Sequence, residues 1–149
     1  MATNTIHIDA SPRAVWDILA DGWRYSSWVV GTSHMFAVEA DWPAKGSKLF
    51  HAAGAWPLVI RDTSEVLVSE PEQRLELEAH GRPFGEARIV IELADEGGGC
   101  RVTMLEEPSA GPGKWLNNPL GEAMLHRRNT EALNRLAAIA ERRTAPRSD

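Results

Sequence analysis

Six stretches in which apolar and polar residues alternate follow one another between residues 33 and 108. Turn-favouring residues separate them, among them Trp42-Pro43, Trp56-Pro57 and the run Gly97-Gly98-Gly99. Alternation with a period of two places every second side chain on the same face of a β-strand. The pattern therefore predicts six antiparallel strands in a meander, near residues 33–40, 47–55, 58–69, 74–81, 86–93 and 100–107.

Helical signals flank this meander on both sides. Residues 3–9 alternate like a further strand, and Ser11-Pro12 then provides an N-cap and a first-turn proline for a short helix. Gly22 interrupts that helix, and residues 23–30 predict a second helical piece that Gly31 ends. The chain thus begins with a strand and two short helices.

A long helix is predicted at the other end of the chain. Asn118 provides its cap and Pro119 its first turn, and it runs to about Arg143. We expect one α+β domain over residues 1–143, with a disordered tail at 144–149.

Composition excludes several functional classes. The net charge of −5 and the scattered Lys and Arg residues disfavour nucleic-acid binding. The N-terminus lacks a basic region followed by an apolar one, and no apolar run is long enough to span a membrane, so we expect a cytoplasmic protein. Cys100 is the single cysteine, and the histidines lack metal-ligand spacing. We therefore predict neither a metal site nor any cofactor.

Tight turns predict which residues oppose one another, because antiparallel partners across a turn have a constant index sum. If Trp56-Pro57 is a two-residue turn, His51 lies opposite Asp62 and Leu49 opposite Ser64. The further predicted pairs are Val66–Leu77, Val68–Leu75, Leu77–Ala87, Leu75–Ile89, Ile91–Met104 and Ile89–Glu106.

These registers divide the sheet into an apolar and a charged face. The predicted apolar face collects Leu49, Ala53, Ile60, Val66, Val68, Leu75, Leu77, Ala87, Ile89, Ile91, Leu93, Val102 and Met104. The predicted solvated face carries Arg61, Glu65, Glu76, Glu78, Glu86, Arg88, Glu92 and Arg101. Four polar residues fall on the apolar side: His51, Asp62, Ser64 and Glu106.

Asn129 raises a related question in the terminal helix. It lies in the centre of an apolar stripe that includes Leu125, Ala132 and Leu136. An unpaired buried amide costs about 1–3 kcal/mol. Either a fixed partner satisfies Asn129, or this face of the helix looks onto a cavity. Glu106 likewise has a structural interpretation, in which it pairs with Arg128 or accepts a hydrogen bond from Asn129.

The order of these elements resembles the START-like helix-grip superfamily, which includes polyketide cyclases and dehydrases and lipid-transfer proteins. The resemblance is carried by the opening IDASPRAVWDILADGWRYSSW, the meander, the hairpin GGGCRVTMLEE and the terminal RNTEALNRLAAIAE. It implies a curved antiparallel sheet of about seven strands that wraps around the long helix and encloses an apolar cavity.

Several polar groups on an apolar concavity are typical of a small-molecule site. We expect ligand contacts from Trp56, Ser64, Leu77, Ile89, Met104, Glu106, Trp115 and Asn129. His51 and Asp62 are the candidate acid/base pair, in which the carboxylate would orient the imidazole and raise its pKa. An acyl-transfer triad with Ser64 is disfavoured, because only a predicted register places the serine near them.

Three functions stay open. The first is binding of a small hydrophobic or amphipathic molecule, polyketide-like or lipid-like. The second is an enzyme of the cyclase/dehydrase kind that uses His51 and Asp62. The third is a protein-interaction domain with a vestigial cavity; a homodimer is compatible with each of them.

Overall fold

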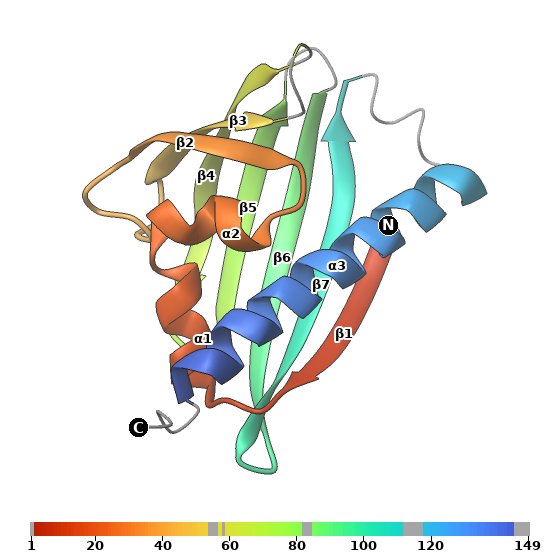
Figure 1. The fold of residues 1–149 in the computed structure, drawn as a ribbon. Coiled ribbons are helices and arrows are strands. Elements are labelled where there is room, and N and C mark those ends of the chain that lie inside the picture. The colour runs from red at the N-terminus through yellow and green to blue at the C-terminus, as the bar shows by residue number, and fades with distance from the viewer. Residues whose placement is uncertain (1, 54–56, 58, 82–84, 112–117, 145–149) are drawn as a thin grey trace.

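The computed structural model describes residues 2–53, 57, 59–81, 85–111 and 118–144. Their elements occur in the predicted order, with the two short helices after the first strand and the long helix last (Figure 1). The elements are β1 (Ala2–Ile8), α1 (Pro12–Leu19), the 3₁₀ helix η1 (Gly22–Arg24), α2 (Tyr25–Trp28), β2 (Thr32–Val38), β3 (Lys48–Ala53), β4 (Ile60–Glu70), β5 (Arg74–Gly81), β6 (Gly85–Glu96), β7 (Gly99–Ala110) and α3 (Pro119–Thr144).

Local capping explains where the helices begin. The Ser11 side chain accepts a hydrogen bond from the Ala14 N–H at 3.1 Å, with Pro12 in the first turn of α1. Asn118 does the same for α3, where its Oδ1 accepts from the Gly121 N–H at 2.9 Å. α3 includes Thr144, so the predicted boundary at Arg143 was one residue short. The rest of the predicted tail lies outside the described residues.

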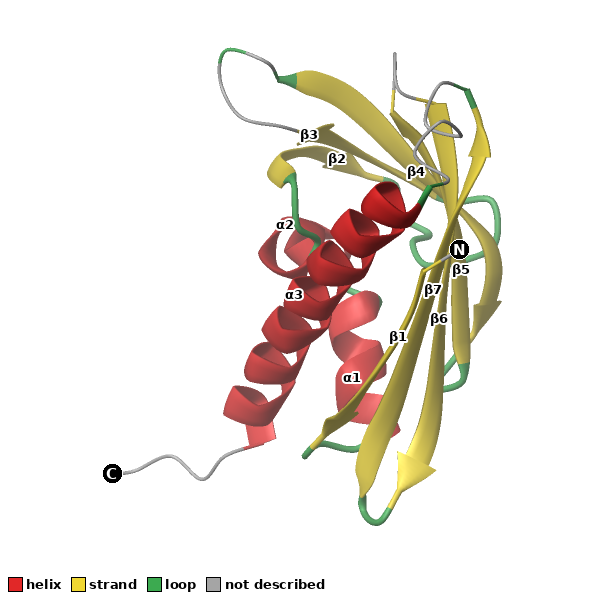
Figure 2. Cartoon of the chain, turned by 90° about the vertical axis from the view of Figure 1, so that its right-hand side faces the viewer, coloured by secondary structure: helices red, strands yellow, loops and turns green. Residues whose placement is uncertain are grey.

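All seven strands form one antiparallel sheet in the order β1-β7-β6-β5-β4-β3-β2. The sheet curves, and α1, α2 and α3 all lie against its concave face (Figure 2). This is the helix-grip architecture that the sequence predicted. Its core joins the inner face of the sheet to α1 and to the second half of α3, where Leu133, Leu136 and Ala140 are buried.

Two of the four predicted hairpin registers are confirmed. His51 lies opposite Asp62 and Leu49 opposite Ser64, while Ile91 lies opposite Met104 and Ile89 opposite Glu106. These hairpins keep one register along the predicted pairs, as the constant index sum assumes.

The registers on both sides of β5 differ from prediction. Gly81 pairs with Gly85, so Leu77 lies opposite Ile89 and Leu75 opposite Ile91 instead of Ala87 and Ile89. This displacement of two residues changes the neighbours and leaves the faces as predicted.

A bulge causes the other difference. Val66 lies opposite Leu77 as predicted, but the β4–β5 register shifts between Val66 and Val68. Val68 therefore lies opposite Glu76, on the outer face, and its predicted place on the apolar face opposite Leu75 was wrong.

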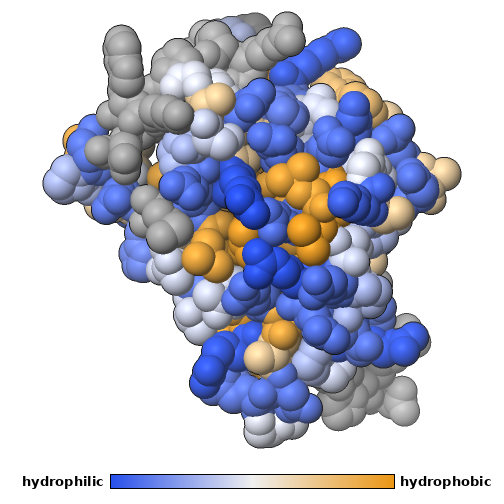
Figure 3. Space-filling model, turned by 180° about the vertical axis from the view of Figure 1, so that it is seen from behind, coloured by the Kyte–Doolittle hydropathy of each residue, from blue (hydrophilic) through white to orange (hydrophobic). Residues whose placement is uncertain are grey.

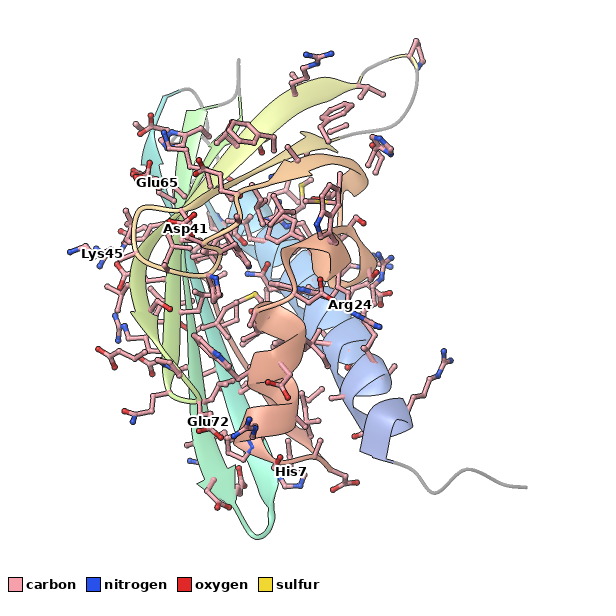
Figure 4. The ribbon with its side chains drawn as sticks, turned by 90° about the vertical axis from the view of Figure 1, so that its left-hand side faces the viewer. His7, Arg24, Asp41, Lys45, Glu65 and Glu72 are labelled. Carbon is pink, nitrogen blue, oxygen red and sulfur yellow. The ribbon has the colours of Figure 1, made fainter. Side chains whose placement is uncertain are left out.

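The outer face is mainly charged, with hydrophobic side chains gathered near its middle (Figure 3). The pairing places Val68, Glu76, Val90 and Leu105 in one row across it. Glu76 was predicted to be solvated, but it is buried and forms ion pairs with Arg74 and Arg88. Glu65 and Lys45 point away from the helices on this side (Figure 4).

Candidate functional site

A cavity of about 430 Å³ lies between the concave face of the sheet, α2 and the first half of α3. Its walls are mostly apolar, and seven of the predicted site residues line it: His51, Asp62, Leu77, Ile89, Met104, Glu106 and Asn129. Drug-sized ligands occupy pockets of about 300–1,000 Å³. The structure thus brings together, on one cavity wall or another, residues that lie up to 78 positions apart in the chain.

A chain of three polar side chains lies beside the cavity. The Tyr25 hydroxyl of α2 is 3.1 Å from Ser64 Oγ of β4, and Ser64 Oγ is 3.2 Å from His51 Nε2 of β3. The Tyr25 ring also lies against the His51 ring, with 5.0 Å between the ring centroids. Ser64 is fully buried behind the other two and contacts His51 without lining the cavity itself.

Burial determines the charge state of this chain. It raises the pKa of Tyr25 to about 12, so the phenol keeps its proton at neutral pH. Burial lowers the pKa of His51 to about 4, so the imidazole is neutral. The predicted rise in the imidazole pKa was therefore wrong, because desolvation of the charged ring outweighs any stabilisation by the carboxylate.

Asp62 faces the cavity from the position opposite His51. Burial raises its pKa to about 6, although the Thr63 N–H, which donates to Oδ1 at 2.7 Å, lowers it in part. His51 Nε2 is engaged with Ser64, and Nδ1 has no hydrogen-bond partner among the described residues. The carboxylate is thus a neighbour of the imidazole and does not orient it through a hydrogen bond.

The structure supports a different interpretation for each of Glu106 and Asn129. Glu106 forms an ion pair with Arg128 of α3, as its structural interpretation predicted. Asn129 is 2 % exposed, and its Nδ2 has no hydrogen-bond partner in the described part of the chain. The second alternative for Asn129, a helix face that looks onto a cavity, is the one that the structure supports.

A family model matches residues 2–141, nearly the whole chain, and describes polyketide cyclases/dehydrases and lipid transport proteins. The chain belongs to this family. No curated protein sequence matches it.

Solved structures agree with this polyketide cyclase/dehydrase and lipid transport fold. A protein of Nitrosomonas europaea is 18% identical with a TM-score of 0.73, and the match covers 97% of this chain and 96% of that one. The Zhui aromatase/cyclase of Streptomyces is 16% identical with a TM-score of 0.69, covering 97% and 94% of the two chains. A protein of Arthrobacter aurescens is 16% identical with a TM-score of 0.73, covering 94% and 85%. At these identities the likeness concerns the fold.

Two of the predicted ligand contacts, Trp56 and Trp115, lie outside the described residues. Conversely, Tyr25 and Trp28 of α2 both line the cavity, although neither was predicted as a ligand contact. A signal was present, because Tyr25 is the only tyrosine of the chain and lies three residues before Trp28 in a predicted helix. Their rings pack edge to face at 5.5 Å.

The described residues contain no group of three or more His, Cys, Asp or Glu side chains that could hold a metal ion. None of the described helices is both long and apolar enough to cross a membrane.

Proposed function

We propose that this protein binds a small hydrophobic or amphipathic molecule, polyketide-like or lipid-like, in the cavity between the sheet and α3. The main support for the proposal is the cavity of about 430 Å³. His51 and Asn129 line it, and each has a buried polar atom without a hydrogen-bond partner among the described residues. In a protein-interaction domain that no longer binds a ligand, we would expect side chains to fill the cavity. The open cavity therefore disfavours the protein-interaction alternative. We keep the cytoplasm as the expected compartment.

Native mass spectrometry of the purified protein, followed by extraction of any retained molecule, tests the proposal without a guess about the ligand. A retained organic molecule that is released on unfolding supports it. Titration with Nile red, a neutral polarity-sensitive dye, tests the cavity directly. We expect saturable fluorescence with one dye per chain.

Filling the cavity is expected to weaken this binding strongly. Ala79 lines the cavity, whereas the adjacent Glu78 lies on the outer face of β5 between Glu65 and Arg88. Ala79→Trp should weaken dye binding at least about tenfold, because the indole would occupy the space. Glu78→Trp is the matched control and should bind like the wild type. Equal binding by Ala79→Trp, with an unchanged circular dichroism spectrum, would place the dye elsewhere.

A second candidate function is proton transfer on a carbonyl compound, as in a cyclase or dehydrase. Asp62 favours it, because a carboxyl with a pKa of about 6 in an apolar cavity is suited to general acid/base catalysis. The neutral His51 would then donate or accept a hydrogen bond beside it. The Zhui structure is that of an aromatase/cyclase, which agrees with this candidate through the shared fold.

Exchange of the methyl hydrogens of 2-acetylnaphthalene in D₂O, followed by NMR, measures such proton abstraction. The base is the carboxylate form of Asp62, so the protein-catalysed rate should rise as the pH increases through about 6. Asp62→Asn should remove that dependence, while Glu65→Gln on the outer face should leave it unchanged. A wild-type rate no faster than buffer would eliminate this candidate.

A further inference from the structure

We infer the proton positions in the Tyr25–Ser64–His51 chain from its contacts, because the distances alone allow either partner to donate. Tyr25 is 2 % exposed, and Ser64 Oγ is the one hydrogen-bond partner of its hydroxyl among the described residues. The phenol proton is therefore donated to Ser64. Ser64 has a single proton, which it then donates to His51 Nε2. A neutral imidazole that accepts at Nε2 carries its own proton on Nδ1.

This arrangement makes His51 Nδ1 a buried hydrogen-bond donor without a partner in the described structure. Asn129 Nδ2, from α3, is a second such donor. Both residues line the cavity from opposite sides, one on the sheet and one on the helix. Because unpaired buried donors are unfavourable, a ligand that brings an acceptor to them gains more than its apolar surface alone would provide.

The charges of the cavity walls oppose an anionic acceptor. Among the described residues, Asp62 and Glu106 line the cavity from the inner face of the sheet, whereas Glu86 lies at its edge with its carboxylate paired to His80. Arg128 is the one cation among the described lining residues, because His51 is neutral, and Arg128 is already paired with Glu106. A ligand carboxylate would therefore lose its hydration and meet the carboxyl group of Asp62 with no free cation of the described lining to pair with.

From these contacts we propose that the cavity selects a ligand with a neutral hydrogen-bond acceptor, such as a ketone carbonyl, at His51 and Asn129, and that it rejects carboxylates such as free fatty acids. Tyr25 and Ser64 are positioning residues, which act by holding the proton on His51 Nδ1. This specificity rests on the proposed binding function and narrows its ligand class.

NMR of the ¹⁵N-labelled protein tests the tautomer without any ligand. At pH 7 we expect a pyrrole-type shift for His51 Nδ1 and a pyridine-type shift for Nε2, with the signals assigned through His51→Gln. Tyr25→Phe removes the donor to Ser64 and should change the balance of the two tautomers. A proton on Nε2 in the wild type would overturn the inference.

Three naphthalenes of nearly the same shape test the ligand class at pH 7: 2-acetylnaphthalene, 2-isopropenylnaphthalene and 2-naphthoate. We expect the affinity for the ketone to be at least about tenfold higher than for either of the others, since only the ketone offers a neutral acceptor. Asn129→Leu should reduce the affinity for the ketone and leave that for the hydrocarbon nearly unchanged.

The outcomes separate this inference from the proposed function. Equal binding of all three probes, or tighter binding of naphthoate, overturns the acceptor selectivity and leaves ligand binding in place. The selectivity also falls if none of the three binds while Nile red does. If Nile red does not bind either, the proposed function fails and the selectivity fails with it.

Discussion

Leu136→Ala is expected to lower the free energy of unfolding by about 2–5 kcal/mol. Leu136 is fully buried in the second half of α3, within the core cluster that joins this helix to the sheet and to α1. The substitution removes apolar contacts and leaves a void in this core, because the closely packed neighbours of Leu136 cannot move far enough to fill it. Urea denaturation followed by circular dichroism measures the change.

Met124→Ala is the control for this prediction. Met124 lies on the same helix and is 61 % exposed. Its truncation should change the stability by no more than about 0.5 kcal/mol. If both variants lost the same amount, the burial of Leu136 against the sheet would not be a main source of stability.

Arg128→Met is expected to lower the free energy of unfolding by about 1–3 kcal/mol. The carboxylate of Glu106 is 6 % exposed and forms an ion pair with Arg128, whose side chain is 42 % exposed. Removal of the guanidinium leaves a buried carboxylate beside an apolar cavity, where water compensates it poorly. The partial exposure of Arg128 places the expected loss below that of a fully buried pair.

Arg135→Met provides a matched control on the same helix. Arg135 pairs with Glu131 at 3.0 Å, but the two side chains are 44 % and 53 % exposed. Solvent screens such a pair, so its loss should cost no more than about 0.5 kcal/mol. The double variant Arg128→Met/Glu106→Gln should recover part of the loss seen in Arg128→Met. An equal loss in Arg128→Met and Arg135→Met would contradict the role given to the burial of Glu106.

The candidate site shows where prediction from sequence succeeded and where it ended. The predicted pairing of His51 with Asp62 is confirmed, because their hairpin keeps one register from Leu49–Ser64 to Ala53–Ile60. The electrostatic consequence was predicted with the wrong sign for His51. Proximity along a strand pair is visible in the sequence, whereas the desolvation that lowers the imidazole pKa depends on what covers the ring.

The bulge in β4 illustrates a second boundary. Val66 and Val68 are spaced like neighbouring residues of one face, but their partners Leu77 and Glu76 are adjacent in β5. Leu67 is therefore an extra residue in β4, and it turns Val68 to the outer side. The same alternation predicted solvent around Glu76, which Arg74 and Arg88 cover. A period of two identifies faces only while the ladder is regular.

The amino-acid sequence by itself determined the class of architecture: the order of strands and helices, the caps of α1 and α3, the inner and outer faces of most strands, and the polar residues on the inner face. These features depend on alternation, turn residues and capping, which act over a few neighbouring positions. Only the tertiary structure decided that Tyr25 joins Ser64 and His51, that Glu106 finds Arg128, and that Asn129 looks onto a cavity. These contacts join side chains of α2, the sheet and α3. Their energies depend on how tightly the helices pack against the sheet and on how much water remains between them.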